Sequence, residues 1–229
     1  MEEIHNWKSW IGTDEAGKGD YFGPLVVAGV YVDGEICNQL LAQGITDGKK
    51  VSKQRIRKLA NWMWNHHEQH IVVIEKMPHE YNSHYSTLQE NGDNLNTMLV
   101  NLHAEVIQKL VDITDAKYGL VDQFAKNGLI EKQLMNTYHS EKSQSNSKIK
   151  IREIPKAERD IAVAAASIIA RDAFLRGIEA LSQQYKIKLP RGSYKVIDTG
   201  KEFVKLHGTD ALRNVAKLHF RLTKVVLEQ

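Results

Sequence analysis

The sequence predicts an α/β fold in which a mixed central β-sheet is flanked by helices. Three observations support this prediction: short apolar segments with strand character come early in the 229-residue chain, helical spacing dominates later, and one long alanine-rich segment is apolar on most faces. Because the strands mostly precede the helices, a mixed sheet is favoured over a strict alternation of strand and helix.

The strand predictions rest on five segments that are short and apolar enough to be buried. They are residues 10–14, 23–32, 71–76, 118–122 and 149–154.

Three helix predictions rest on capping residues and on apolar spacing. Ser52 can cap a helix over residues 53–66, and Asn94 or Asn96 can begin another. Residues 161–181 (IAVAAASIIARDAFLRGIEAL) predict the central buried helix, because alanine favours a helix and allows close packing against a sheet.

The chain length and composition favour a single domain over residues 1–229, with a helical C-terminal portion from about residue 186. The hydrophobic content of 42% and charged content of 26% are ordinary for a globular protein. The polar segment 139–148 (HSEKSQSNSK) predicts an exposed loop. It is not interpreted as a domain linker, because a strand-like segment follows it at once.

Charge and residue counts narrow the possible partners and compartment. The net charge of +3 permits a nucleic-acid partner without requiring one. The single cysteine, Cys37, excludes an intramolecular disulfide and cysteine-rich zinc modules, which fits a reducing compartment.

None of the ten histidines has a partner at zinc-ligand spacing, and His103 and His219 lie in helical patterns that predict structural roles. No apolar run predicts a signal or membrane segment, so we expect a cytoplasmic monomer with no membrane partner.

Residues 12–19 (GTDEAGKG) nearly fit the phosphate-binding loop G-x-x-x-x-G-K-[ST]. Gly19, however, stands where that loop has a hydroxyl residue, and Asp14 and Glu15 add two negative charges. Carboxylates repel a phosphate but attract a divalent cation, which can itself hold a phosphate. The segment therefore predicts a metal site beside a glycine-rich backbone surface.

Acidic residues stand at the ends of two predicted strands. Asp14 and Glu15 stand at the end of the first, and Asp122 ends segment 118–122. A surface acid is one interpretation of each, but the repeated pattern favours carboxylates presented to a cleft. Since successive strand residues point to opposite faces, Asp14 and Glu15 can share a metal through their side chains only where the strand ends or kinks. Otherwise Glu15 can contribute its main-chain carbonyl.

A fourth acid is available just before the long helix, in residues 155–167 (PKAERDIAVAAAS), as Glu158 or Asp160. Both also suit a helix N-terminus, where the helix dipole stabilises negative charge, so spacing leaves the choice open. Asp172 lies roughly 21 Å from Glu158 at about 1.5 Å per residue, too far for one metal site. We expect Asp172 to be a solvated or structural acid.

These motifs resemble the type 2 ribonuclease H family and, within it, the bacterial ribonuclease HIII branch. Segments similar to its opening, third-acid and helical motifs are DEAGKGDYFGP (14–24), YGLVDQF (118–124) and KAERDIAVAAASIIARDAFL (156–175). Agreement extends to residues 81–107 and 189–220, so the resemblance covers nearly the whole chain from the first predicted strand.

The resemblance implies a ribonuclease H-like fold and a metal-dependent endonuclease. The implied reaction is hydrolysis of the RNA strand of RNA/DNA hybrids to 5′-phosphate and 3′-hydroxyl products. The family's catalytic, metal-binding acids correspond to Asp14, Glu15, Asp122 and Glu158, with Asp160 the alternative to the last. The implied cofactors are two Mg²⁺ or Mn²⁺ ions, one activating water and the other stabilising the departing oxygen.

The resemblance also implies a substrate-binding surface. The backbone of Gly17, Lys18 and Gly19 would read ribose 2′-hydroxyls, which distinguish RNA from DNA. Lys49, Lys50 and Lys53 could meet phosphates, although a charge run is usually a solvated face.

Three departures bear on the substrate. The catalytic motif begins after thirteen residues, so we expect no separate N-terminal substrate-binding domain. The branch motif D-S-K reads Asp47-Gly48-Lys49. The sister branch, ribonuclease HII, carries a G-Y-G-T-type motif whose tyrosine is used at RNA–DNA junctions, whereas this chain reads GSYKVID with Tyr194 nearby. The alternatives are therefore incision at single ribonucleotides in DNA, as in ribonuclease HII, or a noncatalytic hybrid-binding protein; retention of all the acids disfavours the second.

Overall fold

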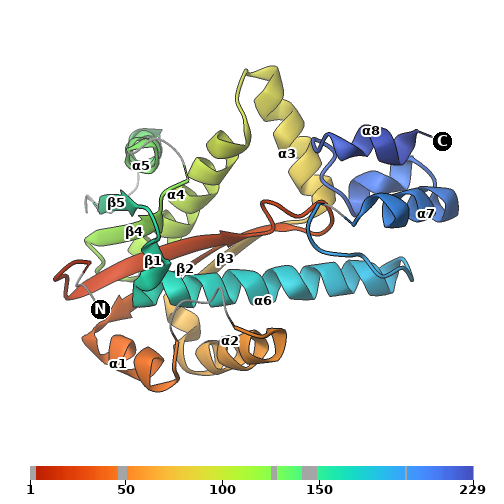
Figure 1. The fold of residues 1–229 in the computed structure, drawn as a ribbon. Coiled ribbons are helices and arrows are strands. Elements are labelled where there is room, and N and C mark those ends of the chain that lie inside the picture. The colour runs from red at the N-terminus through yellow and green to blue at the C-terminus, as the bar shows by residue number, and fades with distance from the viewer. Residues whose placement is uncertain (1–3, 46–50, 125–127, 141–148, 194, 229) are drawn as a thin grey trace. The chain divides into compact units, whose positions relative to one another are not determined.

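A five-stranded sheet, with strand order β3-β2-β1-β4-β5, organises the computed structural model (Figure 1). The structure describes residues 4–45, 51–124, 128–140, 149–193 and 195–228. The strands are β1 (Ser9–Ala16), β2 (Leu25–Asp33), β3 (Ile71–Lys76), β4 (Tyr118–Asp122) and β5 (Lys150–Ile154). Strands β1, β4 and β5 run parallel to one another. The short connection from β1 to β2 makes that pair antiparallel, because a parallel crossover needs a dozen or more residues. The predicted mixed sheet and all five predicted strands are confirmed.

The contacts divide the chain into two compact units. The first unit comprises Met1–Glu15, Val27–Ile74 and Leu95–Asp172, and the second comprises Ala16–Val26, Glu75–Asn94 and Ala173–Gln229. The expectation of a single domain over 1–229 stays a prediction.

The α-helices of the first unit are α1 (Gly34–Ala42), α2 (Lys53–His67), α4 (Leu95–Ile113), α5 (Leu129–Ser140) and the beginning of α6 (Ile161–Gln184). Two short 3₁₀ helices, η2 (Glu68–His70) and η3 (Ala157–Arg159), follow α2 and precede α6, respectively. The Ser52 side chain accepts a hydrogen bond from the Arg55 amide (3.3 Å), so the predicted cap of α2 is confirmed. The first two residues of the predicted loop 139–148 belong to α5, and residues 141–148 lie outside the described residues.

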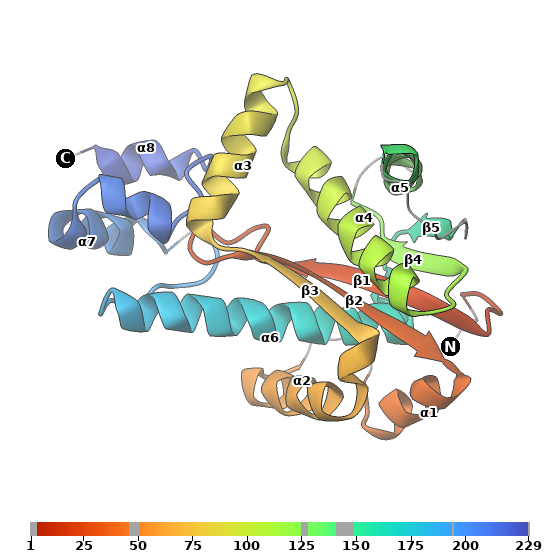
Figure 2. The same cartoon turned by 180° about the vertical axis from the view of Figure 1, so that it is seen from behind.

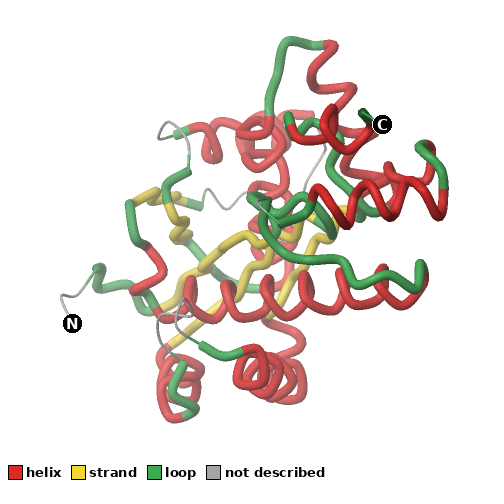
Figure 3. Tube along the Cα trace, turned by 45° about the vertical axis from the view of Figure 1, so that its right-hand side comes forward, coloured by secondary structure: helices red, strands yellow, loops and turns green. Residues whose placement is uncertain are grey.

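Two glycines let helices pack closely on opposite faces of the sheet, as Figures 1 and 2 show for α4 and the first turns of α6. A Cβ on Gly12 would lie 2.3 Å from the backbone of Ala162 in α6. A Cβ on Gly29 would lie 2.5 Å from the Val106 side chain in α4. The strands, yellow in Figure 3, therefore lie between helical layers in this unit, and its core is the alanine-rich start of α6 and the apolar face of α4.

The second unit contains α3 (Pro78–Glu90), the end of α6, α7 (Ile197–His207), the 3₁₀ helix η4 (Asp210–Asn214) and α8 (Leu222–Leu227). The large fully buried side chains of its core include Tyr21, Phe22, Tyr81 and Phe203. An isolated antiparallel bridge joins Phe22 to Ala216. Among the described residues, no helix is long and apolar enough to cross a membrane.

Candidate active site

Asp14 and Asp122 lie at the same edge of the sheet. The parallel pairing of β1 with β4 aligns Thr13 with Val121, and each aspartate is the next residue of its strand. Because the carboxyl ends of parallel strands meet at one edge, pairing of the strands brings the two acids together. This register explains why the acids that the sequence places at the ends of two strands lie near each other.

The Asp14 carboxylate stands in an environment that disfavours its negative charge. It accepts hydrogen bonds from the Ser167 hydroxyl of α6 and from the Glu15 amide (2.8 Å to Oδ1). Burial and the negative charges of Glu15 and Asp122 nevertheless raise the pKa of Asp14 to about 7, burial having the largest effect. A cation would relieve this repulsion, so the arrangement fits a metal site.

Glu15 points to the other face of the sheet, because β1 continues through it to Ala16. Its Oε2 lies 3.3 Å from Nε2 of His103 in α4. The other ring nitrogen of His103, Nδ1, lies 2.8 Å from the Thr13 hydroxyl, and the ring stacks on Phe124 with centroids 4.9 Å apart. Thr13 and Glu15 thus face α4, while the intervening Asp14 faces α6.

His103 is a residue of this site that sequence reasoning classed as structural. Its side chain is fully buried, and its ring contacts join β1 to α4. The other histidine, His219, lies in a turn, so its predicted helical placement is wrong, although its Nδ1 lies 3.2 Å from the Tyr81 hydroxyl, a contact that fits the predicted structural role.

Asp122 fixes the segment that carries Glu158. Its Oδ1 accepts a hydrogen bond from the Ala157 amide (2.9 Å), the residue next to Glu158 in η3. Lys156, just before η3, has a left-handed backbone (φ 58°), which turns the chain out of β5. The Glu158 side chain is 7% exposed.

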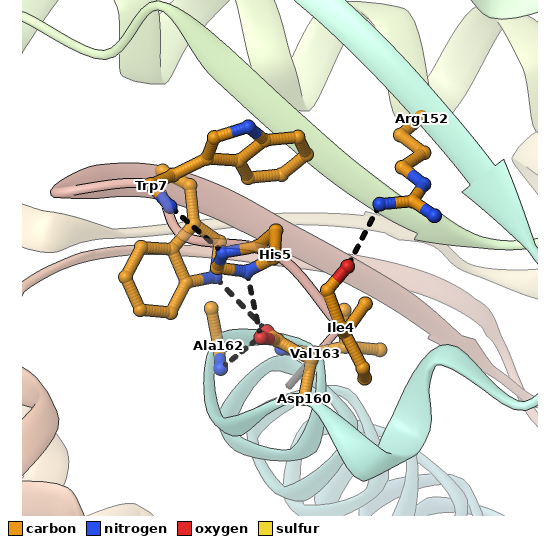
Figure 4. A network of polar contacts seen from close by, with 8 residues as sticks. Ile4, His5, Trp7, Arg152, Asp160, Ala162 and Val163 are labelled. Atoms are coloured by element: carbon orange, nitrogen blue, oxygen red, sulfur yellow. Dashed lines mark hydrogen bonds and ion pairs between the residues drawn. The ribbon is translucent and has the colours of Figure 1, made fainter. Parts of the chain in front are cut away.

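Asp160, the alternative fourth acid, caps α6 (Figure 4). Its Oδ1 accepts hydrogen bonds from the Ala162 amide (2.9 Å) and the Val163 amide (3.2 Å). The Trp10 indole also donates to Oδ1 (3.0 Å), and His5 Nε2 lies 3.1 Å from Oδ2. These contacts give Asp160 a structural role.

Asp172 is buried, with 2% exposure, and its Oδ1 lies 3.8 Å from Arg57 Nε. Of the two roles predicted for Asp172, the structural role is confirmed and the solvated role is wrong.

The four predicted ligands are brought together in part. The charges of Glu15 and Asp122 raise the pKa of Asp14, and Glu158 adjoins the amide that binds Asp122. Across the described ranges, no group of three or more His, Cys, Asp or Glu side chains is arranged to hold a metal ion. Carboxylate oxygen is nevertheless the donor type that Mg²⁺ and Mn²⁺ prefer.

The glycine loop belongs to the second unit. Gly17 has φ 88°, and a Cβ there would lie 2.2 Å from the Pro24 carbonyl, so the position requires glycine. At Gly19 nothing lies within 4 Å of such a Cβ. Lys18 between them is partly exposed. The predicted substrate residues Lys49 and Lys50, and also Tyr194, lie outside the described residues.

Comparison with known proteins identifies the family. The pattern that defines the family described as Ribonuclease HII matches residues 11–223. The chain is 39% identical over 218 residues to Ribonuclease HIII of Protochlamydia amoebophila, covering 95% of this chain and 68% of that protein. It is 35% identical over 214 residues to Ribonuclease HIII of Chlamydia pneumoniae, covering 92% and 67%.

A solved structure, Bst-RNase HIII in complex with Mn²⁺, matches with a TM-score of 0.80 and 34% identity over 96% of this chain and 69% of that chain. The ribonuclease H-like fold implied by the sequence motifs is thereby confirmed. The chain belongs to the type 2 ribonuclease H family, in its ribonuclease HIII branch, and is a ribonuclease H enzyme.

Proposed function

We propose that this protein is a metal-dependent endoribonuclease that hydrolyses the RNA strand of RNA/DNA hybrids and leaves 5′-phosphate and 3′-hydroxyl ends. The observation that carries the proposal is the approach of Asp14 to Asp122 at the ends of β1 and β4, with the charge of Glu15 beside them, in a chain of this family. Action as a monomer in the cytoplasm is part of the same proposal.

The proposed metal ligands are Asp14, Glu15, Asp122 and Glu158, with Mg²⁺ or Mn²⁺ as the cofactor. Support comes from the negative charges of Glu15 and Asp122 around Asp14 and from the Mn²⁺ complex of the related Bst-RNase HIII. When bound, two such ions lower the pKa of a coordinated water and neutralise charge on the scissile phosphate. The carboxylates hold and orient this centre, and Glu15 would contribute its main-chain carbonyl, because its side chain is directed to His103.

The proposed substrate contact is the backbone of Gly17, Lys18 and Gly19 with ribose 2′-hydroxyls. The open space around Gly19 supports it, since a sugar can approach a backbone that carries no side chain. Lys18 in this loop, together with Lys49 and Lys50, is proposed to contact phosphates.

The test compares a uniform RNA/DNA hybrid with a DNA duplex that contains one ribonucleotide, each with Mg²⁺ and with Mn²⁺. We expect cleavage of the hybrid and poor cleavage of the single-ribonucleotide duplex, because the chain lacks the sister branch's G-Y-G-T-type motif. Comparable rates, lost selectively for the single-ribonucleotide duplex in Tyr194→Phe, would instead support ribonuclease HII-like incision. Hybrid binding without cleavage under either metal would support the noncatalytic alternative.

A further inference from the structure

Lys217 is a fully buried lysine in the second unit, with 0% exposure. Lysine is almost never fully buried unless its ammonium is paired. Burial lowers the pKa of Lys217 to about 7, although the negative charge of Asp20 opposes the change. Removing this group from water costs free energy, so the specific contacts of its Nζ need an explanation.

Those contacts are two main-chain carbonyls of one short segment. Nζ donates to the Asp20 carbonyl (2.9 Å) and to the Gly23 carbonyl (2.7 Å). Nζ also lies 5.8 Å from the centroid of the Tyr81 ring, within cation–π range. The ammonium group thus binds both ends of segment 20–23.

The backbone around Lys217 binds the same segment. The Lys217 amide donates to the Tyr21 carbonyl (2.8 Å), and the Gly23 amide donates to the Val215 carbonyl (3.0 Å). On another side, Gly192 donates its amide to Asp20 Oδ1 (2.6 Å) and accepts from the Tyr21 amide (3.0 Å). Segment 20–23 is therefore held by residues 215–217 and by Gly192.

Segment 20–23 continues directly from the glycine loop. The Asp20 amide donates to the Gly17 carbonyl (3.2 Å) and closes a turn over residues 17–20. The residue that ends this turn is also the one whose carbonyl Lys217 binds. A displacement of Asp20 would therefore change the direction of the Gly17–Gly19 backbone.

We propose that Lys217 is a positioning residue for RNA-strand binding, which holds the Gly17–Gly19 loop in its binding shape through the Asp20 and Gly23 carbonyls. The inference rests on the proposed function, in which that loop reads the ribose 2′-hydroxyls. Lys217 acts through the loop and does not touch the substrate.

The experiment measures steady-state cleavage of a uniform RNA/DNA hybrid by the wild type, Lys217→Met and Lys205→Met. Methionine fills a similar volume but donates no hydrogen bond, and the exposed Lys205 of α7 provides the matched control. We expect KM to rise about tenfold in Lys217→Met with kcat nearly unchanged. The loop is proposed to bind the substrate equally well in the ground state and the transition state, and losing such binding raises KM alone. Lys205→Met should keep the KM of the wild type.

Amide hydrogen exchange provides a second readout that needs no activity. In Lys217→Met the amides of residues 17–23 should exchange faster, whereas those of α4 should not. If Lys217→Met does not fold, Lys217→Gln, a shorter side chain whose amide keeps part of the hydrogen bonding, is measured below its unfolding midpoint and should show the same two changes at smaller size. A lowered midpoint with unchanged KM and unchanged loop exchange would overturn the inference, as would a fall in kcat alone. Absence of cleavage by the wild type would instead overturn the proposed function, while the exchange data would still report whether Lys217 holds the loop.

Discussion

Asp14 and Asp160 are aspartates of the same unit, and their surroundings are opposite in kind. Asp160 accepts hydrogen bonds from the indole of Trp10 and two backbone amides, and His5 lies beside its second oxygen. Asp14 also accepts hydrogen bonds, from the Ser167 hydroxyl and the Glu15 amide, but it faces the negative charges of Glu15 and Asp122. A carboxylate whose hydrogen bonds the protein supplies stabilises the fold, whereas one surrounded by like charge is available to a cation.

Glu158 stands two residues from Asp160, but we propose that it belongs with Asp14 as a metal-binding acid. It is carried by the segment that Asp122 holds through the Ala157 amide. Asp160 and Glu158 thus differ in their contacts, although both lie near the start of a helix. Substituting a proposed metal-binding acid should reduce cleavage, whereas substituting Asp160 should reduce stability.

The largest expected effect comes from Asp14→Asn and Asp122→Asn. Each change removes a charged ligand and keeps its volume, so hybrid cleavage should fall by about 10³-fold or more, the rate equivalent of several kcal/mol of metal-dependent stabilisation. Circular dichroism should show an intact fold. Near wild-type turnover of either variant at saturating metal would show that these acids are not the ligands.

Glu158→Gln and Asp160→Asn should produce opposite losses. Glu158→Gln should reduce turnover by about 10²-fold or more with little change in thermal midpoint, because it weakens the proposed metal site. Asp160→Asn should cost about 1–3 kcal/mol of stability, since an amide cannot accept all the bonds that the carboxylate accepts. Assayed below its midpoint, Asp160→Asn should cleave nearly as well as the wild type. A larger loss of turnover in Asp160→Asn than in Glu158→Gln would show that Asp160 is the metal ligand and Glu158 is not.

A smaller effect is expected for His103→Leu, which removes the contacts to Thr13 and Glu15 but fills the buried space. Substitution of a residue that orients a metal ligand typically lowers metal affinity or activity by about 10- to 100-fold. The measurement is cleavage rate as a function of Mn²⁺ concentration. An unchanged metal dependence would limit His103 to packing.

The smallest expected effect is on stability as a function of pH in the metal-free protein. Because the pKa of Asp14 is raised to about 7, the folded chain retains a proton that the unfolded chain has lost between about pH 4 and 7. Stability from this group is therefore present below pH 4 and is lost as the pH rises through 7. Denaturant unfolding should show this decrease in the wild type and a smaller one in Asp14→Asn. Equal pH dependence in the two proteins would contradict the repulsive environment of Asp14.

The sequence predicts the local features of this molecule better than its long-range contacts. Strands 71–76 and 118–122 and the Ser52 cap depend on neighbouring residues, and their predictions are confirmed. The gathering of acids at strand ends was predictable because the acids follow apolar segments. The contact of Thr13 with His103 joins residues 90 apart, and a histidine in an apolar helical pattern gives no sign of it.

The roles of Asp160 and Lys217 could not be predicted from the sequence either, because they also depend on long-range contacts. Asp160 binds Trp10, 150 positions earlier, and Lys217 binds the Gly23 carbonyl, 194 positions earlier. In the sequence, Asp160 is one of two acids at a helix start and Lys217 is one of many lysines. Their functions depend on which distant backbone or ring the fold places beside them.

Calorimetric titration of Mn²⁺ into the wild type, Asp14→Asn and Asp160→Asn measures directly whether the repelled acids form the metal site. All three proteins should be titrated well below their unfolding midpoints. We expect binding to the wild type and to Asp160→Asn with similar affinity, and at least about tenfold weaker binding to Asp14→Asn, since one charged ligand is lost. Equal affinity in the wild type and Asp14→Asn, or a selective loss in Asp160→Asn, would contradict the assignment of the metal site to the acids at the ends of β1 and β4.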